Sequence, residues 1–129
     1  MKITLDTNFL ISATIWDYSE SHKLLKKLLT TNAELFTSKQ IMQEFAEVLI
    51  RDFQYKNEEI ETLINSLMSS IKSIETTDNI NFIKEDPDDD KILECAVSSS
   101  SEYIITYDNH LLKLKEYNGI KIIKPEDFP

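Results

Sequence analysis

The sequence predicts an α/β protein with one domain, residues 1–129, in which helices cover both faces of a central, mostly parallel sheet. Short apolar segments typical of strands alternate with amphipathic segments typical of helices, which is the pattern of βαβ units. The length of 129 residues fits one domain with one core. Together these two observations favour a three-layer α/β/α arrangement.

The expected strands are short and carry alternating or β-branched apolar residues. In the first strand, Ile3 and Leu5 alternate with polar residues before the chain reaches Asp6. The segment after residue 102 is apolar and ends at Asp108. The expected strands are residues 2–6, 33–38, 73–76 (a brief edge strand), 102–108 and 120–125.

The expected helices carry apolar residues at helical spacing. The clearest is 57–71, which has acids in its first turn and an apolar stripe that reaches Ile71. Thr37 and Gln40 have the spacing of a capping box at the start of another helix. The remaining expected helices are residues 21–29, a segment from Asp88 onward and residues 110–114.

The composition is that of an ordinary soluble globular protein, with 41% hydrophobic and 29% charged residues. No apolar run approaches the roughly 18 residues that span a membrane, and the N-terminus has no signal-peptide pattern. The single cysteine, Cys95, excludes an internal disulfide and is expected in the core. We therefore expect a cytoplasmic protein without a membrane segment.

The charge distribution limits how the chain can meet nucleic acid. The net charge is −9, and residues 51–90 hold eleven acids against four bases. Such a surface argues against nonspecific binding of a polyanion, which usually rests on basic residues. Gly119 is the one glycine, so the sequence has no glycine-rich phosphate loop of the Walker or dinucleotide-binding kind.

Several carboxylates are expected at one edge of the sheet. Asp6 and Asp108 each end a strand, and ligands of open α/β sheets bind beyond the carboxyl ends of the strands. Glu44 lies about two turns into the helix after the second strand, and Asp88–Asp90 begin another helix. Taken singly, each acid also has a structural explanation as a helix cap or a first-turn acid.

Capping does not explain why these acids converge. Carboxylates that a fold brings together are unstable unless they are protonated or neutralised by a cation. Oxygen ligands alone suit Mg²⁺ or Mn²⁺, which also bind phosphate oxygens and activate water for phosphodiester cleavage. A metal ion would also explain how an acidic protein acts on a polyanion.

Five segments, taken in order, resemble the PIN domain. They are "LDTNFLISA", "TSKQIMQEFAEVL", "DPDDDKILECA", "YIITYDNHLLKL" and "IKIIKPEDF", which together span essentially the whole chain. The chain is most similar to the small bacterial and archaeal PIN proteins known as toxins of toxin–antitoxin pairs. The resemblance implies a PIN-like α/β/α sandwich and metal-dependent cleavage of RNA.

The resemblance also implies which residues form the site. Carried over by position, the catalytic and metal-binding acids are Asp6, Glu44, Asp89 and Asp108. Asp89 takes the third place because Ile92, Leu93 and Ala96 follow it as in the family pattern; Asp90 is the rival and Asp88 the less favoured alternative. The supporting residues are Asn8 and Thr106, which would orient carboxylates or water, and Ser38, which either caps a helix or contacts substrate.

The resemblance further implies Mg²⁺ or Mn²⁺ as cofactor, an RNA substrate, a cognate antitoxin protein and a homodimer. One alternative keeps the fold without strong catalysis, as an RNA- or protein-binding module. Another is a phosphoacceptor receiver domain, which is disfavoured because Asp6 stands alone after the first strand. His22 and His110 are expected to be surface residues without a catalytic role, and Trp16 to lie in the core or at an interface.

Overall fold

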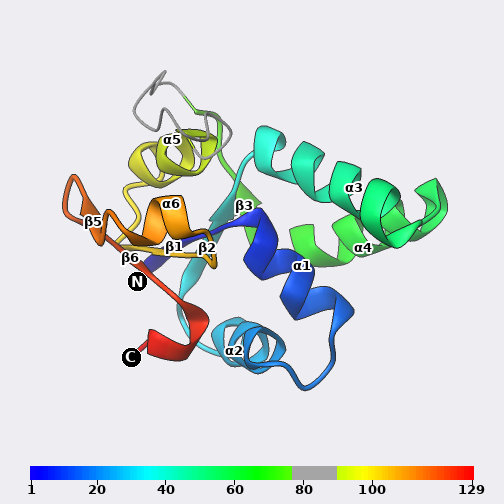
Figure 1. Cartoon of the computed structure of the whole chain (residues 1–129), viewed down its shortest axis with the longest axis horizontal. Helices are drawn as coiled ribbons and strands as arrows, with labels where there is room; N and C mark the ends of the chain where they lie inside the picture. The colour runs from blue at the N-terminus through cyan, green and yellow to red at the C-terminus, as the bar shows by residue number, and fades with distance from the viewer. Residues whose placement is uncertain (77–89) are drawn as a thin grey trace.

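The computed structural model describes residues 1–76 and 90–129 and forms a six-stranded sheet in the order β3-β2-β1-β4-β6-β5 (Figure 1). Neighbouring strands are parallel, except that β5 and β6 are antiparallel. The strands are β1 (Lys2–Leu5), β2 (Glu34–Thr37), β3 (Ile71–Ser73), β4 (Tyr103–Ile105), β5 (Glu116–Tyr117) and β6 (Ile120–Ile123). The predicted α/β class with a mostly parallel sheet is confirmed.

Helices cover both faces of this sheet. They are α1 (Thr7–Ile15), α2 (Glu20–Leu29), α3 (Lys39–Phe53), α4 (Asn57–Met68), α5 (Asp90–Ser98) and α6 (Asn109–Leu112), followed by the 3₁₀ turn η2 (Pro125–Asp127). Alternate strand residues enter two buried clusters. Ile3, Leu5 and Ile105 pack with α1–α4, whereas Phe36 and Ile104 pack with α5 and α6. None of the described helices is long and apolar enough to cross a membrane.

Helix α1 has no counterpart among the predicted elements. Its sequence, "TNFLISATI", is apolar on nearly every side and therefore lacks the amphipathic pattern by which the other helices are identified. Phe9, Leu10, Ile11 and Ala13 are all buried, as expected of a helix that is hydrophobic all round. The helix begins directly after β1, so Asp6 is its N-cap.

Two predicted helix boundaries are wrong. The cap of α3 is Ser38 and not Thr37, because the Ser38 hydroxyl accepts a hydrogen bond from the Ile41 amide at 3.2 Å; of the two roles predicted for Ser38, the structure shows the helix cap. Helix α4 ends at Met68, and Ile71 begins β3 by pairing with Leu35. The edge strand therefore lies two residues earlier than predicted.

Strand β5 was not predicted either. It pairs with β6 through a two-residue turn, in which Asn118 and Gly119 have φ angles of 50° and 82°. Positive φ at both central residues is typical of the tight hairpin turn that Asn-Gly favours. The Asn118-Gly119 dipeptide is therefore a feature of the sequence from which this hairpin can be predicted. Asp88, from which another helix was expected, lies outside the described residues.

We expect the packing of α3 on the sheet to be a main source of stability. Phe45 is fully buried, so Phe45→Ala should lower the free energy of unfolding by about 3–5 kcal/mol. Glu47 lies on the exposed side of the same helix, so Glu47→Ala should change it by less than about 0.5 kcal/mol. Urea unfolding of both variants measures the difference, and equal effects would contradict this packing.

Candidate active site

Asp6 is held at the carboxyl end of β1 by bonds to both of its side-chain oxygens. The Thr7 amide donates to Oδ1 at 2.6 Å, and the Thr106 hydroxyl donates to Oδ2, also at 2.6 Å. The Asp6 amide donates to the Ile105 carbonyl at 3.1 Å, which continues the pairing of β1 with β4. The carboxyl group is therefore fixed, and the residue is only 3% exposed.

The loop after β4 carries the second acid of this edge. The Asp108 amide donates to the Thr106 hydroxyl oxygen at 2.9 Å, so that Thr106 bridges the backbone of Asp108 and the carboxyl of Asp6. The Asn8 side-chain oxygen accepts from the Tyr107 amide at 3.0 Å. The two residues predicted to orient the carboxylates thus both hold this loop against the end of β1.

Tyr107 secures the same loop from its other side. Its hydroxyl lies 2.7 Å from the Ser21 hydroxyl on α2 and donates to Glu126 Oε1 at 2.9 Å. Partial burial raises the pKa of this phenol, and the neighbouring Glu126 adds to the effect. Tyr107 therefore ties α2 and the C-terminal turn to the loop that carries Asp108, a role that the sequence did not reveal.

Asp108 is the N-cap of α6, since its Oδ1 accepts from the His110 amide at 2.7 Å. The His110 ring nitrogen Nδ1 lies 3.7 Å from the same oxygen. The other histidine, His22, has its Nδ1 2.9 Å from the Ala13 carbonyl oxygen, which explains its position without a catalytic role. Asp108 thus caps a helix and also lies at the edge where Asp6 is found.

Glu44 reaches this region from the second turn of α3. Its Oε2 forms an ion pair with the ammonium group of Lys91 on α5, and both side chains are partly buried. Lys91 was not among the predicted site residues, although it directly follows the run of acids. Asp90, the rival for the third acid position, is buried, with 4% exposure, at the start of α5. Asp89 lies outside the described residues.

The pKa of Asp6 shows that three of the acids share one electrostatic environment. It is raised from 3.8 to about 7, chiefly because burial disfavours the charged form. The hydrogen bonds from Thr106 and Thr7 lower it, and the charges of Glu44 and Asp108 raise it further. Glu44 and Asp108 are therefore each close enough for their charges to act on the Asp6 carboxyl.

The side-chain atoms of this cluster are of the chemical type that binds a hard divalent cation. They are carboxylate oxygens, which Mg²⁺ and Mn²⁺ prefer. Thr7, which begins α1, and Thr37, which ends β2, also have buried hydroxyl oxygens without a hydrogen-bond partner among the described residues. In residues 1–76 and 90–129, however, no three histidine, cysteine, aspartate or glutamate side chains are grouped so as to hold a metal ion.

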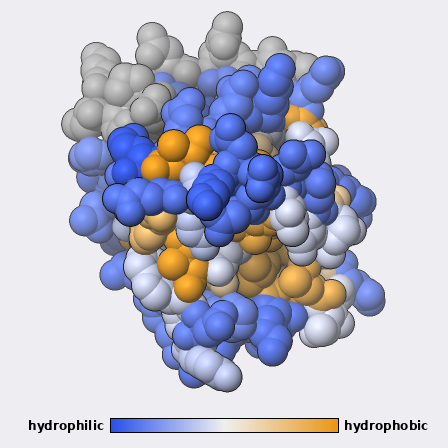
Figure 2. All heavy atoms as spheres, turned by 90° about the vertical axis from the view of Figure 1, so that its right-hand side faces the viewer, coloured by the Kyte–Doolittle hydropathy of each residue, from blue (hydrophilic) through white to orange (hydrophobic). Residues whose placement is uncertain are grey.

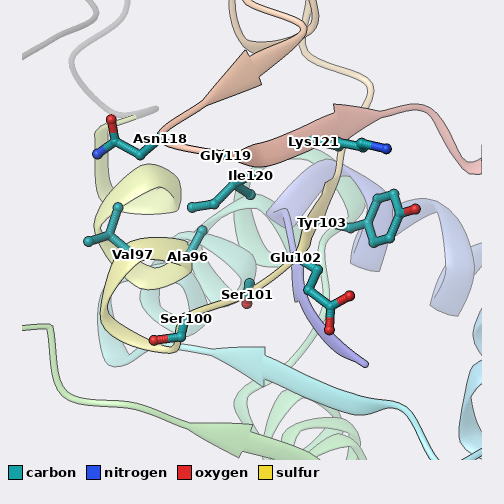
Figure 3. A pocket seen from close by; sticks show the side chains of 10 residues that line it. All are labelled: Ala96, Val97, Ser100, Ser101, Glu102, Tyr103, Asn118, Gly119, Ile120 and Lys121. Carbon is teal, nitrogen blue, oxygen red and sulfur yellow. The ribbon is translucent and has the colours of Figure 1, made fainter.

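A separate hollow of about 490 Å³ lies at the opposite edge of the sheet (Figure 3). It is bordered by Tyr103 and Ile120, at which β4 and β6 begin, and by the end of α5. None of the predicted acids lines it. The carboxylates at the carboxyl ends of the strands therefore remain the candidate active site.

The sequence and the fold define the class of protein. The family model described as PIN domain matches residues 2–110, a span that runs from β1 past Asp108, and the chain belongs to this family. PIN domains are generally nucleases. The predicted resemblance is thereby confirmed.

A solved structure gives a more particular likeness. The chain is similar to one in the crystal structure of VapBC2 from Rickettsia felis bound to a DNA fragment from their promoter. The TM-score is 0.65 at 15% sequence identity, with 96% of this chain and 98% of that chain covered. At this identity the likeness shows the shared fold. No curated protein matches the chain.

The raised pKa of Asp6 predicts how the stability of the protein depends on pH in EDTA. The folded state binds the proton of Asp6 more tightly than the unfolded state, in which the pKa is near 3.8. The free energy of unfolding should therefore fall as the pH rises from about 4 to about 7, by at most about 4 kcal/mol. Asp6→Asn should remove this fall, because the amide keeps the shape without the charge.

Urea unfolding at several pH values measures the effect. The exposed Asp127 offers a matched control, since Asp127→Asn should leave the fall in stability unchanged. A pH dependence that is the same in the Asp6→Asn variant and in the original protein would contradict the assignment.

Proposed function

We propose that the chain is a metal-dependent endoribonuclease and the toxin component of a type II toxin–antitoxin pair. Mg²⁺ or Mn²⁺ would be held by Asp6, Glu44, Asp108 and Asp89, with Asp90 as the alternative to Asp89. The observation that carries the proposal is the Asp6 carboxyl, whose pKa is raised chiefly by burial and further by the charges of Glu44 and Asp108. A divalent cation beside this carboxyl would stabilise its charged form.

The residues of this chain would divide the work as follows. Asp6 and Asp108 present oxygens at the end of the sheet, and Thr106 and Asn8 fix their orientation through the loop after β4. When bound, the ion supplies a Lewis acid that lowers the pKa of water and stabilises charge on phosphoryl oxygens. The attacking group is then water and not the ribose 2′-hydroxyl, so cleavage should leave a 5′-phosphate.

The net charge of −9 is compatible with this substrate if the ion, and not the protein surface, meets the phosphate. The rival function is that of a PIN-fold module that binds RNA or protein with little catalysis. The absence of a ready-made group of three metal ligands among the described residues favours that rival. The presence of acids at all four positions of the family pattern favours the nuclease.

A protein partner is part of the proposal. Hydrophobic side chains are exposed between hydrophilic ones on the face at which the ends of α1, α3 and α4 lie (Figure 2). Trp16 and Ile50 are 53% and 48% exposed, and the Trp16 ring meets Phe53 edge-on with centroids 5.7 Å apart. Exposed aromatic residues are typical of interfaces, and the similar VapBC2 chain comes from a complex. We infer that an antitoxin or a second copy of the chain covers this face, in the cytoplasm.

Removing any one acid should abolish RNA cleavage. Asp6→Asn, Glu44→Gln and Asp108→Asn each withdraw a charge from the site while keeping the side-chain shape, so the rate should fall by orders of magnitude. Glu47→Gln, an exposed change on the same helix as Glu44, is the matched control and should keep its activity. The assay is cleavage of a labelled RNA by the purified protein in Mn²⁺, Mg²⁺ or EDTA.

Two outcomes of this assay would contradict the proposal. One is equal cleavage in EDTA and in Mn²⁺ by a preparation free of contaminating nuclease. The other is a product that carries a 2′,3′-cyclic phosphate, because that product requires the 2′-hydroxyl as the attacking group. Binding of RNA without any cleavage would support the rival function.

The run of acids from Asp88 to Asp90 provides a further prediction. We expect Asp89→Asn to abolish cleavage and leave folding intact, whereas Asp88→Asn and Asp90→Asn stay near wild type. Loss of a first-turn charge costs only about 0.3–1 kcal/mol of helix stability, so capping alone predicts small losses at all three positions. Parallel cleavage assays of the three variants at saturating Mn²⁺ separate these cases. Loss of cleavage in Asp90→Asn alone would mean that Asp90, and not Asp89, is the third acid of the site.

A further inference from the structure

The ion pair between Lys91 and Glu44 differs from other ion pairs on the described surface. The Lys91 and Glu44 side chains are 20% and 31% exposed, whereas those of Lys23 and Glu20 are 61% and 64% exposed. Exposed pairs contribute little because water screens them. A partly buried pair is screened less, so Lys91 and Glu44 affect each other more strongly.

The position of Lys91 is unfavourable for a cation unless an acid compensates it. The Lys91 side chain is only 20% exposed, and a partly buried ammonium group loses hydration that an opposite charge must replace. Glu44 supplies the compensation across the contact between α3 and α5. Without that acid, the ammonium group would gain by turning to water on its flexible stem.

Glu44 also belongs to the acidic cluster, since its charge raises the pKa of Asp6. One carboxylate therefore interacts with the Lys91 ammonium and with the group of acids proposed to hold the divalent cation. The negative charge that Lys91 neutralises is the charge that a metal ion would use. The Lys91 ammonium group and a divalent metal ion would therefore compete for the Glu44 carboxylate.

We propose that Lys91 is an exchangeable counter-ion, which neutralises Glu44 in the metal-free protein and must release it when a divalent cation binds. The inference rests on the proposed function, because it takes the cation site of that proposal as given. Lys91 lowers the affinity of the site for the metal and stabilises the fold when the metal is absent. It is thus an affinity-setting residue and not a catalytic one.

The test is calorimetric titration of the full chain with Mn²⁺ after removal of metal by EDTA and dialysis. Lys91→Met keeps the apolar stem and removes the charge, so it should bind Mn²⁺ about tenfold more tightly than wild type. Lys91→Arg keeps the charge and should bind no more tightly than wild type. Lys23→Met, which removes the exposed lysine of the Lys23–Glu20 pair on α2, is the matched control and should bind as wild type does.

Melting temperatures give a second readout that does not depend on activity. In EDTA, Lys91→Met should melt below wild type, because the cluster has lost its counter-ion; in saturating Mn²⁺ the difference should shrink. Lys91→Gln repeats both measurements in case the methionine variant folds poorly. Unchanged or weaker Mn²⁺ binding by both neutral variants would overturn the proposal.

The Asp6→Asn variant separates the failure of this inference from that of the proposed function. In one outcome, wild type binds Mn²⁺, Asp6→Asn does not, and the neutral Lys91 variants bind as wild type does. That outcome would support the metal site and contradict the counter-ion role of Lys91. If neither wild type nor the neutral variants bind Mn²⁺, both proposals fall together.

Discussion

The structure depends on the burial of one carboxyl group at the end of β1. Asp6 loses its hydration there, which raises its pKa to about 7, and it is held by the Thr7 amide and the Thr106 hydroxyl. The parallel register of β1 and β4, with Leu5 opposite Ile105, brings these groups together. The sheet, α1 and the loop after β4 must therefore keep their positions for the group to remain satisfied.

The same constraint gives the surrounding residues their roles. Because Asp6 is fixed, the charges of Glu44 and Asp108 act on it directly, and a positive charge beside them would stabilise its charged form. Lys91 supplies part of that charge from α5. In the proposed mechanism a divalent cation supplies the rest, so that folding, metal binding and catalysis all depend on one balance of charge.

Much of the fold and part of the site followed from local patterns. Asp6 directly follows β1, whereas the strand predicted to reach Asp108 ends at Ile105, so that Asp108 lies three residues beyond β4 as the cap of α6. Both acids still lie beyond the carboxyl ends of neighbouring parallel strands. Helix α1 could not be found in this way, because it is apolar on all sides. Lys91 could not be found either, because its contact with Glu44 arises only from the packing of α3 against α5.

The central claim is that a divalent cation shares the environment of the Asp6 carboxyl. The most direct measurement is a pH titration of the Asp6 carboxyl carbon by ¹³C NMR, once in EDTA and once in saturating Mg²⁺. The account predicts a midpoint near pH 7 in EDTA and a midpoint far below it with Mg²⁺, because the ion favours the charged form. A midpoint that is the same with and without Mg²⁺ would contradict the shared site.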